Sequence, residues 1–203
     1  MLTISKAILT MARTKDFDEN EVLTKAIQLF WHKGYNGTSM QDLVDTLGIS
    51  RSSLYDTYTD KQTLFIKALE SYHQAGVLKI QQIINDTDSA KETIRRLLEL
   101  VASDSAGDKQ QKGCFMVNAE VEVAPHDQEV NKVVCNNDQE MEHVFYEVIK
   151  KGQETGEIKN NQDARSLARF IFTTIKGIRV SAKSTNDPAV FDDIIKLTAS
   201  TLD

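Results

Sequence analysis

Apolar residues recur at helical spacing along almost the whole chain, and this periodicity most limits the possible folds. Val22, Ala26 and Phe30 form one stripe, and residues three or four positions apart share a helix face. The 203 residues contain two prolines and nine glycines, too few for the many turns of an all-β sandwich. With 40% hydrophobic residues, the chain can build a core in one or two domains. The sequence therefore predicts an all-α fold of roughly nine helices.

Two short helices joined by a glycine turn are predicted in the first third of the chain. The run Thr38–Gln41 is typical of a capping box, in which a Thr hydroxyl and a Gln side chain satisfy free backbone amides. Helically spaced apolar residues follow until Gly48, which ends the first short helix. Ser50 then caps a second helix that begins at Arg51. This arrangement predicts a helix-turn-helix.

Longer helices are expected in the rest of the chain. The capping boxes Thr59–Gln62 and Ser89–Glu92 each open a helix, and the first of these runs to about Asn85. The polar residues 103–112 are predicted to form a loop. Further helices are expected over residues 114–123, 127–151, 162–183 and 188–202, with Gly152 ending the second of these and Pro188 opening the last.

The polar face of the second short helix suits contacts with double-stranded DNA. In a helix-turn-helix this helix enters the major groove, where an arginine such as Arg51 bonds guanine O6 and N7 together. Serines contact bases or phosphates, and a helix N-terminus favours an anion. The expected DNA contacts are Thr38, Ser39, Ser50, Arg51, Ser52, Ser53, Tyr55, Tyr58 and Lys61. The spacing alone leaves a second interpretation open, a helical corner whose polar residues are merely solvated.

The charge balance taken alone argues weakly against a nucleic-acid partner. The chain carries 24 basic and 30 acidic residues, a net charge of −6, whereas phosphate neutralisation favours a basic surface. Residues 1–70 hold 8 basic and 9 acidic side chains, which leaves 16 basic and 21 acidic residues for the remainder. The acidity is therefore concentrated behind the predicted helix-turn-helix.

The cysteines and the N-terminal residues indicate the cellular compartment in which the protein folds. Two cysteines, Cys114 and Cys135, without a convincing secretory signal are typical of a reducing cytosol. Residues 1–16 are expected to form a flexible leader, within which Met11 is a second possible start. No stretch approaches the ~18 apolar residues that a membrane span needs. We expect a cytoplasmic protein without a membrane partner.

Several motifs in fixed order resemble the TetR/AcrR family of bacterial transcriptional regulators. They are FWHKGY at 30–35, TSMQDL at 38–43 and LGIS at 47–50, followed by Leu54, Tyr55, Tyr58, Lys61 and Leu64. The resemblance covers about residues 17–77 and implies a DNA-binding domain there, with its helix-turn-helix at about residues 40–59. It also implies a ligand-binding and dimerisation domain over residues 78–203, and repression that a small molecule relieves.

The family resemblance also implies roles for individual residues. The helix that contacts bases is Ser50–Tyr55, and Thr38, Tyr55, Tyr58 and Lys61 match positions that commonly hold phosphates. Two positions depart from the family pattern: Val44 stands where an alanine is usual, and Ser53 stands near a position often taken by glycine. These departures leave the fold as expected and the operator sequence open.

The second domain resembles the family more loosely, around Cys114. The segments Gly113–Asn118 and Ala124–Asp127 are similar to one branch in which a Gly-Cys dipeptide opens the sixth helix. Some members sense electrophiles or oxidants with a cysteine near this place, and a thiol at a helix N-terminus can have a lowered pKa. The alternative for Cys114 is a small buried core residue. Cys135 is the lesser candidate for a sensor.

Polar or aromatic residues that interrupt apolar stripes are candidates for a small-molecule pocket. Asn137 lies inside the apolar stripe of helix 127–151, where a tertiary hydrogen bond is the alternative to ligand contact. The ligand candidates are Cys114, Asn118, Glu122, Asn137, Phe145 and Phe170.

Neither a metal, a cofactor nor a catalytic site is expected. Glu140 and His143 have the Glu-x-x-His spacing of di-iron bundles, but the second copy that such a site needs is missing, which favours a solvated face. The sequence contains no phosphate-binding glycine loop, no G-x-S-x-G turn and no H-E-x-x-H pair. We therefore predict that the protein is not an enzyme.

The last two predicted helices are apolar on more than one side. Such a helix must be covered by its own core and by a second surface. The expected residues of a four-helix dimer interface are Phe170, Ile171, Thr174, Ile178, Phe191, Ile194 and Ile195. An internal hairpin of a monomer is the alternative. We prefer the homodimer because two heads roughly 34–36 Å apart can bind a palindrome.

Together these features predict a homodimeric repressor that binds a palindromic operator and is released by a small-molecule inducer. The alternatives are a helical small-molecule carrier or enzyme without sequence-specific DNA function, and an activator. The operator, the inducer and the regulated genes are not contained in the sequence.

Overall fold

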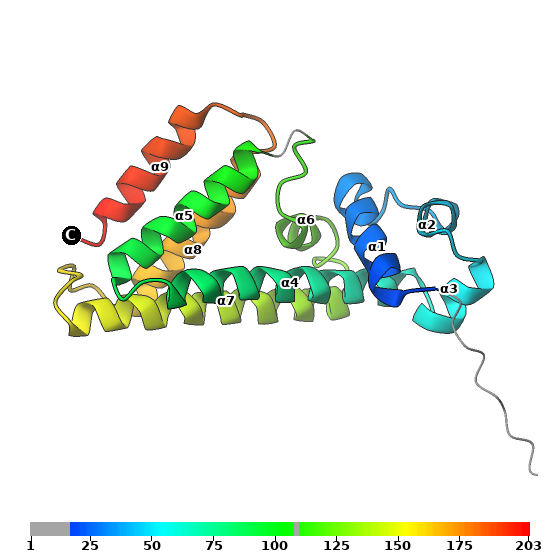
Figure 1. The fold of residues 1–203 in the computed structure, drawn as a ribbon, viewed down its shortest axis with the longest axis horizontal. Coiled ribbons are helices and arrows are strands. Elements are labelled where there is room, and N and C mark those ends of the chain that lie inside the picture. Colours follow the sequence, from blue (N-terminus) through cyan, green and yellow to red (C-terminus); the bar gives the residue numbers. More distant parts are fainter. Residues whose placement is uncertain (1–16, 108–109) are drawn as a thin grey trace, which may run out of the picture.

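The computed structural model describes residues 17–107 and 110–203, and these residues form nine helices without a strand (Figure 1). The helices are α1 (Glu19–Lys33), α2 (Met40–Leu47), α3 (Arg51–Tyr58), α4 (Lys61–Asn85), α5 (Ala90–Ala106), α6 (Phe115–Glu122), α7 (Gln128–Glu154), α8 (Ala164–Ser181) and α9 (Pro188–Ser200). The predicted all-α class is confirmed. The predicted leader, residues 1–16, lies outside the described residues.

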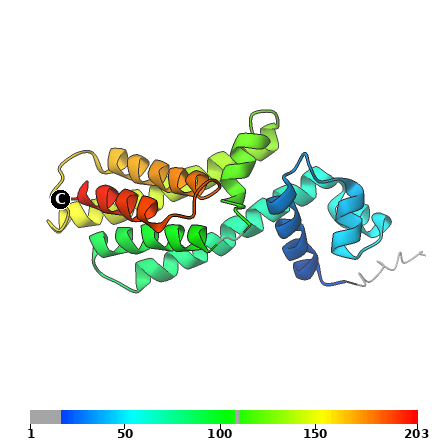
Figure 2. The same ribbon diagram turned by 90° about the horizontal axis from the view of Figure 1, so that it is seen from above.

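The helices follow one another along an elongated molecule (Figures 1 and 2). Helices α1 to α3 and the start of α4 form one end, which we call the head. Helices α5, α8 and α9 lie at the other end, and α6 lies between them and the head. The long helix α4 runs out of the head and packs against α7. One continuous helix therefore joins the two ends.

Two groups of buried residues form the core, and their division differs from the expected domain boundary. The first group joins head residues such as Phe30, Leu54 and Phe65 to Phe115 of α6 and Val134 of α7. The second group fills the space between α5, α7, α8 and α9. The segment from α6 to the start of α7 thus completes the hydrophobic core of the head.

The start of α2 corrects the predicted capping box. Ser39, not Thr38, is the N-cap, and Asp42 rather than Gln41 is its partner. The Asp42 amide donates to the Ser39 hydroxyl at 3.1 Å, and the Ser39 amide donates to the Asp42 carboxylate at 2.9 Å. Thr38 does not cap α2. Its hydroxyl donates instead to the Gly34 carbonyl oxygen at 2.6 Å.

Helices α5 and α7 extend further than predicted. Helix α5 continues through Ala106, into the expected loop. Helix α7 does not end at Gly152 but runs to Glu154, and Gly156 at φ +74° follows it. Gly152 is a packing residue, since a Cβ atom there would lie 2.6 Å from a methyl carbon of Ile158 and 2.7 Å from the Cβ of Ala90.

Candidate nucleic-acid interface and ligand cavity

The turn between α2 and α3 sets the angle between the two helices. Gly48 ends α2 in the left-handed region at φ 69°, which a residue without a Cβ adopts at little cost. Two residues later Ser50 caps α3, and its hydroxyl accepts from the Ser53 amide at 3.1 Å. Leu54, on the inner face of α3, is fully buried. The apolar face of α3 is thereby fixed on the head, and its polar face points outward.

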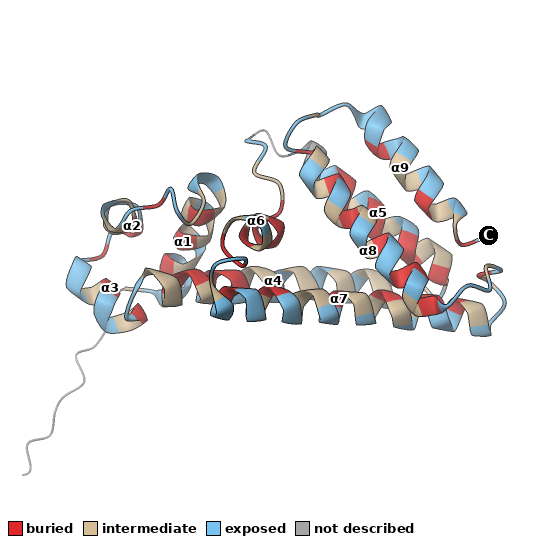
Figure 3. Cartoon of the chain, turned by 180° about the vertical axis from the view of Figure 1, so that it is seen from behind, coloured by how far each residue is buried: buried red, intermediate tan, exposed pale blue. Residues whose placement is uncertain are grey.

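The outward face of α3 carries most of the expected base contacts. Arg51 and Ser52 are exposed, and Tyr55 is 41% exposed. Much of α3 carries the pale blue of exposed residues in Figure 3. The Arg51 guanidinium lies 5.9 Å from the centroid of the Tyr55 ring. The hydroxyl of Ser50 lies 2.8 Å from that of Ser53 and 2.9 Å from that of Ser52. Within residues 17–107 and 110–203 the bonds of these side chains stay inside α3 and its cap, so the face is open to a duplex.

Two expected phosphate contacts are buried. Tyr58 is 2% exposed and belongs to the head core, and burial, together with the negative charge of Glu19, raises the pKa of its hydroxyl. Thr38 is 1% exposed, and its hydroxyl already bonds Gly34. Neither side chain reaches the surface that a phosphate would approach. In both cases the sequence showed a polar side chain, but it did not show whether that side chain faces the core or the solvent.

Two further expected DNA contacts, Ser39 and Lys61, are not buried. Ser39 is exposed at the N-terminus of α2, and neighbouring Asp42 bonds Lys33 at 2.8 Å. Lys61 is half-buried, with its Nζ 4.2 Å from the centroid of the Tyr35 ring. Burial lowers the pKa of Lys61, although the carboxylate of Glu122 opposes this change.

A cavity of about 520 Å³ lies between the head and the C-terminal helices. Side chains from α1, α4, α5, α6, α7 and α8 line it, and three expected residues, Cys114, Asn137 and Phe145, are among them. Its volume falls in the range of roughly 300–1,000 Å³ that is usual for small-molecule sites. The polar or aromatic lining residues that the sequence analysis did not select include Trp31, Tyr72, Lys176 and Arg179.

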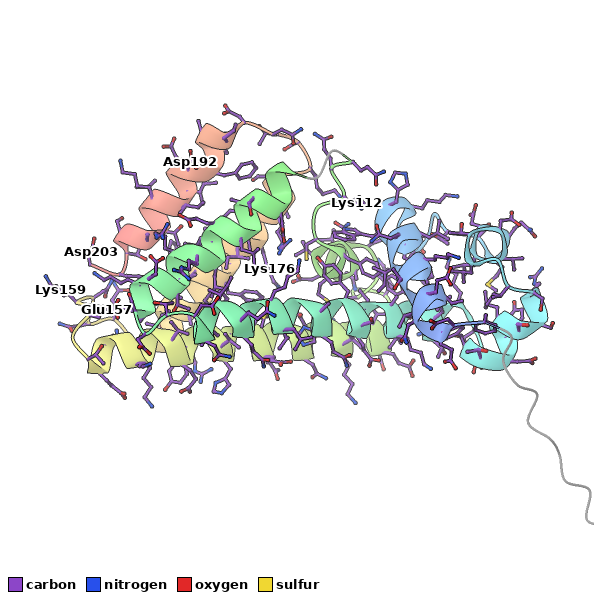
Figure 4. The ribbon with its side chains drawn as sticks, viewed as in Figure 1. Lys112, Glu157, Lys159, Lys176, Asp192 and Asp203 are labelled. Atoms are coloured by element: carbon purple, nitrogen blue, oxygen red, sulfur yellow. The ribbon has the colours of Figure 1, made fainter. Side chains whose placement is uncertain are left out.

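Lys176 is the centre of a half-buried charge cluster in the cavity wall, beside α6 (Figure 4). Its Nζ donates to the two carboxylate oxygens of Glu120 at 2.9 and 2.8 Å, and it also bonds Asp138. Burial alone would lower the pKa of Lys176, but the hydrogen bonds to Asp138 and Glu120 outweigh it and the pKa is raised. The cluster joins α6, α7 and α8.

Aromatic residues form the wall nearest the head. The Trp31 and Tyr72 rings meet edge to face, with centroids 5.1 Å apart. The Tyr72 hydroxyl donates to the Cys114 sulfur at 3.7 Å, and burial raises the pKa of Tyr72. Cys114 is 8% exposed and belongs to the head core. Its position agrees with the core interpretation and leaves a sensor role a prediction. Cys135 is exposed on α7.

Three of the ligand candidates lie outside the cavity lining. The Glu122 carboxylate accepts from the backbone amides of Tyr35 at 3.1 Å and Asn36 at 2.8 Å, so it ties α6 to the head. The Asn118 amide group donates to the carbonyl oxygen of Lys112 at 2.8 Å and thus holds the loop before α6. Phe170 is 49% exposed on the outer face of α8. In this structure the three residues have structural or surface positions and take no part in the cavity lining.

The expected dimer residues divide into two sets. Ile171, Ile178 and Phe191 are at most 2% exposed and belong to the chain's own second core, so they cannot form the outer surface of a dimer. Thr174, Ile194 and Ile195 are half-buried and Phe170 is exposed. The structure adds exposed apolar residues that the sequence analysis did not select, namely Val180, Val190 and Leu197, which are 51%, 37% and 69% exposed. The exposed apolar residues Phe170, Val180, Val190 and Leu197 lie on α8 and α9, and we call this set the apolar strip.

The acidic and histidine residues of α7 do not converge on a metal site. Glu140 bonds His73 of α4 at 2.7 Å, and His143 lies 3.7 Å from Glu147. Within residues 17–107 and 110–203, no three such side chains are placed to hold an ion. None of the helices in these ranges has the length and apolar character of a membrane-crossing segment.

Two family models match the chain. The model described as "Bacterial regulatory proteins, tetR family" matches residues 22–68, and the one described as "Tetracyclin repressor-like, C-terminal domain" matches residues 90–198. The first match contains the helix-turn-helix, and the second contains most of the cavity wall.

Individual relatives are similar in sequence to this chain along nearly its whole length. The HTH-type transcriptional regulator YezE of Bacillus subtilis is 33% identical over 95% of this chain and 100% of its own length. The HTH-type transcriptional repressor ComR of Escherichia coli is 27% identical over 94% of this chain and 90% of its own.

A solved structure matches in fold as well. It is a cysteine variant of the TetR-family regulator CifR in complex with 26-bp operator DNA, 25% identical, with a TM-score of 0.84 and coverage of 94% of this chain and 100% of that one. The matched models span both the head and the cavity-bearing helices. The chain therefore belongs to the TetR family of bacterial regulatory proteins, which are helix-turn-helix transcriptional regulators.

Proposed function

We propose that this protein is a homodimeric repressor that binds a palindromic operator through α3 and releases it when a small molecule enters the cavity. One observation carries the proposal: Trp31, a residue of the head, lines the cavity. A ligand there touches the DNA-binding head directly. The printed names of ComR and of the operator-bound CifR complex support repression and operator binding.

Helix α6 provides a second connection between the cavity and the head. Glu120 on α6 bonds Lys176 in the cavity wall, and Glu122, two residues later, bonds the head backbone at Tyr35 and Asn36. A ligand that changes the position of α6 therefore changes the angle of the head. The shift in operator affinity equals the difference in ligand affinity between the two head positions.

The apolar strip on α8 and α9 supports the homodimer. Phe170, Val180 and Leu197 lie about half or more exposed on these two helices, which pack together in the chain. Exposed apolar residues that gather on neighbouring helices mark a protein interface. If the strips of two copies pair across a two-fold axis, the dimer carries two heads. A palindromic operator requires two heads, one for each half-site.

The alternative is a helical carrier of small molecules in which the head has no DNA function. The free polar face of α3 favours the repressor. We also propose that the protein works in the cytoplasm, where operator DNA is located, and that the cavity binds its ligand without catalysing a reaction.

Selection of bound duplexes from a randomised pool, using the purified full chain, tests the proposed function. We expect an enriched palindrome with two half-sites, and affinity for the selected duplex that falls as salt rises because phosphate contacts release counterions. Failure to enrich any motif at low salt, with the protein folded, contradicts the proposed function and favours the carrier.

A further inference from the structure

We infer that the ligand of the cavity is an amphipathic oxyanion, whose carboxylate or phosphate group pairs with Arg179 and whose apolar body lies between α5, α7 and α8. This inference rests on the proposed ligand-responsive function and specifies the chemical class of the ligand. It follows from the charges of the cavity wall and their partners.

Three of the basic side chains in the wall already have partners. Lys176 bonds Glu120 and Asp138, as described above. His73 bonds Glu140 at 2.7 Å, and Lys112 donates to the side-chain oxygen of Gln28 at 3.1 Å. These groups are engaged within the protein and do not need a ligand.

Arg179 differs from them. It lines the cavity and is half-buried, yet its guanidinium makes no hydrogen bond or ion pair with any residue in the described ranges. Guanidinium offers five donors in a planar fork that matches the two oxygens of a carboxylate or a phosphate. A partly buried cation without a partner is unfavourable, and an anionic ligand group would satisfy it.

The position of Arg179 places this anion at the head end of the cavity. Arg179 lies on α8 one turn after Lys176, and its carbonyl oxygen is 3.1 Å from the point where a Cβ of Gly113 would lie. Its charge also acts on Tyr72, where it opposes the rise in pKa that burial causes. The ligand's charged group therefore lies beside the same wall as Trp31, the cavity residue of the head.

The remaining wall is apolar and suits the body of the ligand. It includes Leu97, Val101, Met141, Phe145, Phe172 and Ile175 from α5, α7 and α8. Burial of an apolar chain here contributes roughly 25 cal/mol per Å². The cavity thus has an apolar part and a cationic group, which is the pattern that an amphipathic acid requires.

A cationic ligand fits the wall less well. Glu120 and Asp138 are the half-buried carboxylates that could attract one, but Lys176 already neutralises part of their charge through three bonds. A ligand cation would have to displace this lysine. Lys79 and Asp104 also line the cavity, but both are exposed, and water solvates their charges.

The chain contains a single tryptophan, Trp31, so its fluorescence reports ligand binding in the cavity directly. We would titrate the full chain, without DNA and below micelle-forming concentrations, with dodecanoate, dodecyl phosphate, dodecanol and dodecyltrimethylammonium. We expect saturable binding of at least one oxyanion, with an affinity about 10- to 100-fold above that of dodecanol. The better of the two oxyanions identifies a carboxylate or a phosphate ligand.

Variants on the same helix test the role of Arg179. Arg179→Gln should lose this preference for the oxyanion and retain the affinity for dodecanol. Arg169→Gln is the matched control, because Arg169 is an exposed arginine of α8 that bonds Glu142 at 3.0 Å outside the cavity lining. If circular dichroism shows that Arg179→Gln does not fold, Arg179→Lys replaces it, and dodecanoate should weaken more than dodecanol because lysine lacks the bidentate fork.

Three results would overturn the inference: equal affinity for dodecanol and both oxyanions, tighter binding of the ammonium compound, or no saturable oxyanion binding. Because the titration contains no DNA, its outcome is separate from that of the operator selection. A chain that selects an operator but prefers no oxyanion disproves the ligand class and leaves the proposed repressor function standing.

Discussion

The indole Nε1 of Trp31 donates a hydrogen bond to the carbonyl oxygen of Gly113 at 3.1 Å. This bond joins α1 of the head to the residue just before Cys114, the N-cap of α6. Gly113 has φ +68°, and the space beside it is filled by Lys183 and the backbone of Arg179. The first helix of the head, α6 and α8 therefore meet at one point of the cavity wall.

Replacing Trp31 with phenylalanine tests this contact. The ring remains, but the N–H donor is lost and the Gly113 carbonyl oxygen loses a partner. We expect the free energy of unfolding to fall by about 1 kcal/mol, which lowers Tm by roughly 2–4 °C in a chain of this length. His32→Phe, at the exposed neighbouring position, is the control and should leave Tm unchanged. Equal Tm values for the two variants and the wild type would disprove the contribution of the bond.

Arg51 is expected to contribute base selectivity. It is exposed on α3, and its guanidinium lies over the neighbouring Tyr55 ring. Arg51→Ala should cost about 1–3 kcal/mol for the selected operator and relax the preference at one base position of each half-site. Lys25→Ala, a surface lysine of α1 that bonds Glu21, is the control for lost positive charge. A selected motif identical to that of the wild type would remove Arg51 from the base contacts.

Gly34 cannot accept a side chain without strain. Its φ of 78° and ψ of 166° favour glycine, and a Cβ atom there would lie 2.9 Å from Oε2 of Glu122. Gly34→Ala should lower the free energy of unfolding by about 1–3 kcal/mol, measured by urea titration. In the double variant with Glu122→Ala the close contact disappears but the backbone strain persists. If Gly34→Ala is as stable as the wild type, the described loop geometry is wrong.

Glu157 caps α5 from a distant part of the chain, and this contact should depend on pH. Its carboxylate accepts from the backbone amides of Ala90 at 2.8 Å and Lys91 at 3.0 Å, and from the Ser89 hydroxyl. Partial burial alone would raise the pKa of Glu157, but these hydrogen bonds outweigh it and the pKa is lowered. A lowered pKa in the folded state means that the charged carboxylate stabilises the fold above the unfolded pKa of about 4.3.

Glu157→Gln should therefore lower Tm at pH 7 by about 2–4 °C, the effect of losing roughly 1 kcal/mol of capping. The difference from the wild type should shrink as the pH falls below about 4.3, because the wild-type carboxyl then becomes protonated as well. Thermal denaturation at a series of pH values measures this change. A difference that is constant from pH 7 to pH 3 would show that the charge of Glu157 makes no contribution.

The apolar strip predicts how the dimer can be broken. Leu197 is 69% exposed on α9, and Leu197→Glu places a charge in the proposed interface. We expect sedimentation to show a monomer and operator affinity to fall steeply. Leu78→Glu is the matched control, because Leu78 is 61% exposed on α4, away from the strip. A dimer that survives Leu197→Glu but not Leu78→Glu would place the interface elsewhere.

The ends of helices were predictable from the sequence where a capping residue marks them. They were less predictable where contacts between distant helices determine how far a helix continues. The end of α4 at Asn85 and the Ser50 cap follow from short-range patterns and are confirmed. The glycine at 152 indicated a helix end. The structure shows instead that Ala90 and Ile158 pack so closely on this position that the helix has room only for a glycine there.

The candidate site was predictable only in part for the same reason. Arg51, on the surface of a short helix, needed no tertiary information. Arg179 and Trp31 reach the cavity because α8 and α1, far apart in the sequence, are brought together by the fold. Likewise, spacing predicted an apolar helix over residues 162–183 but not that Ile171 is buried while neighbouring Phe170 is exposed.

The shared core of the head and α6 also sets how much of the chain must be synthesised before the head core is complete. Phe65 packs against Phe115 with ring centroids 5.5 Å apart, and the same core extends to Val134. A nascent chain that has emerged only as far as α4 holds all the DNA-facing residues but leaves this apolar surface in water.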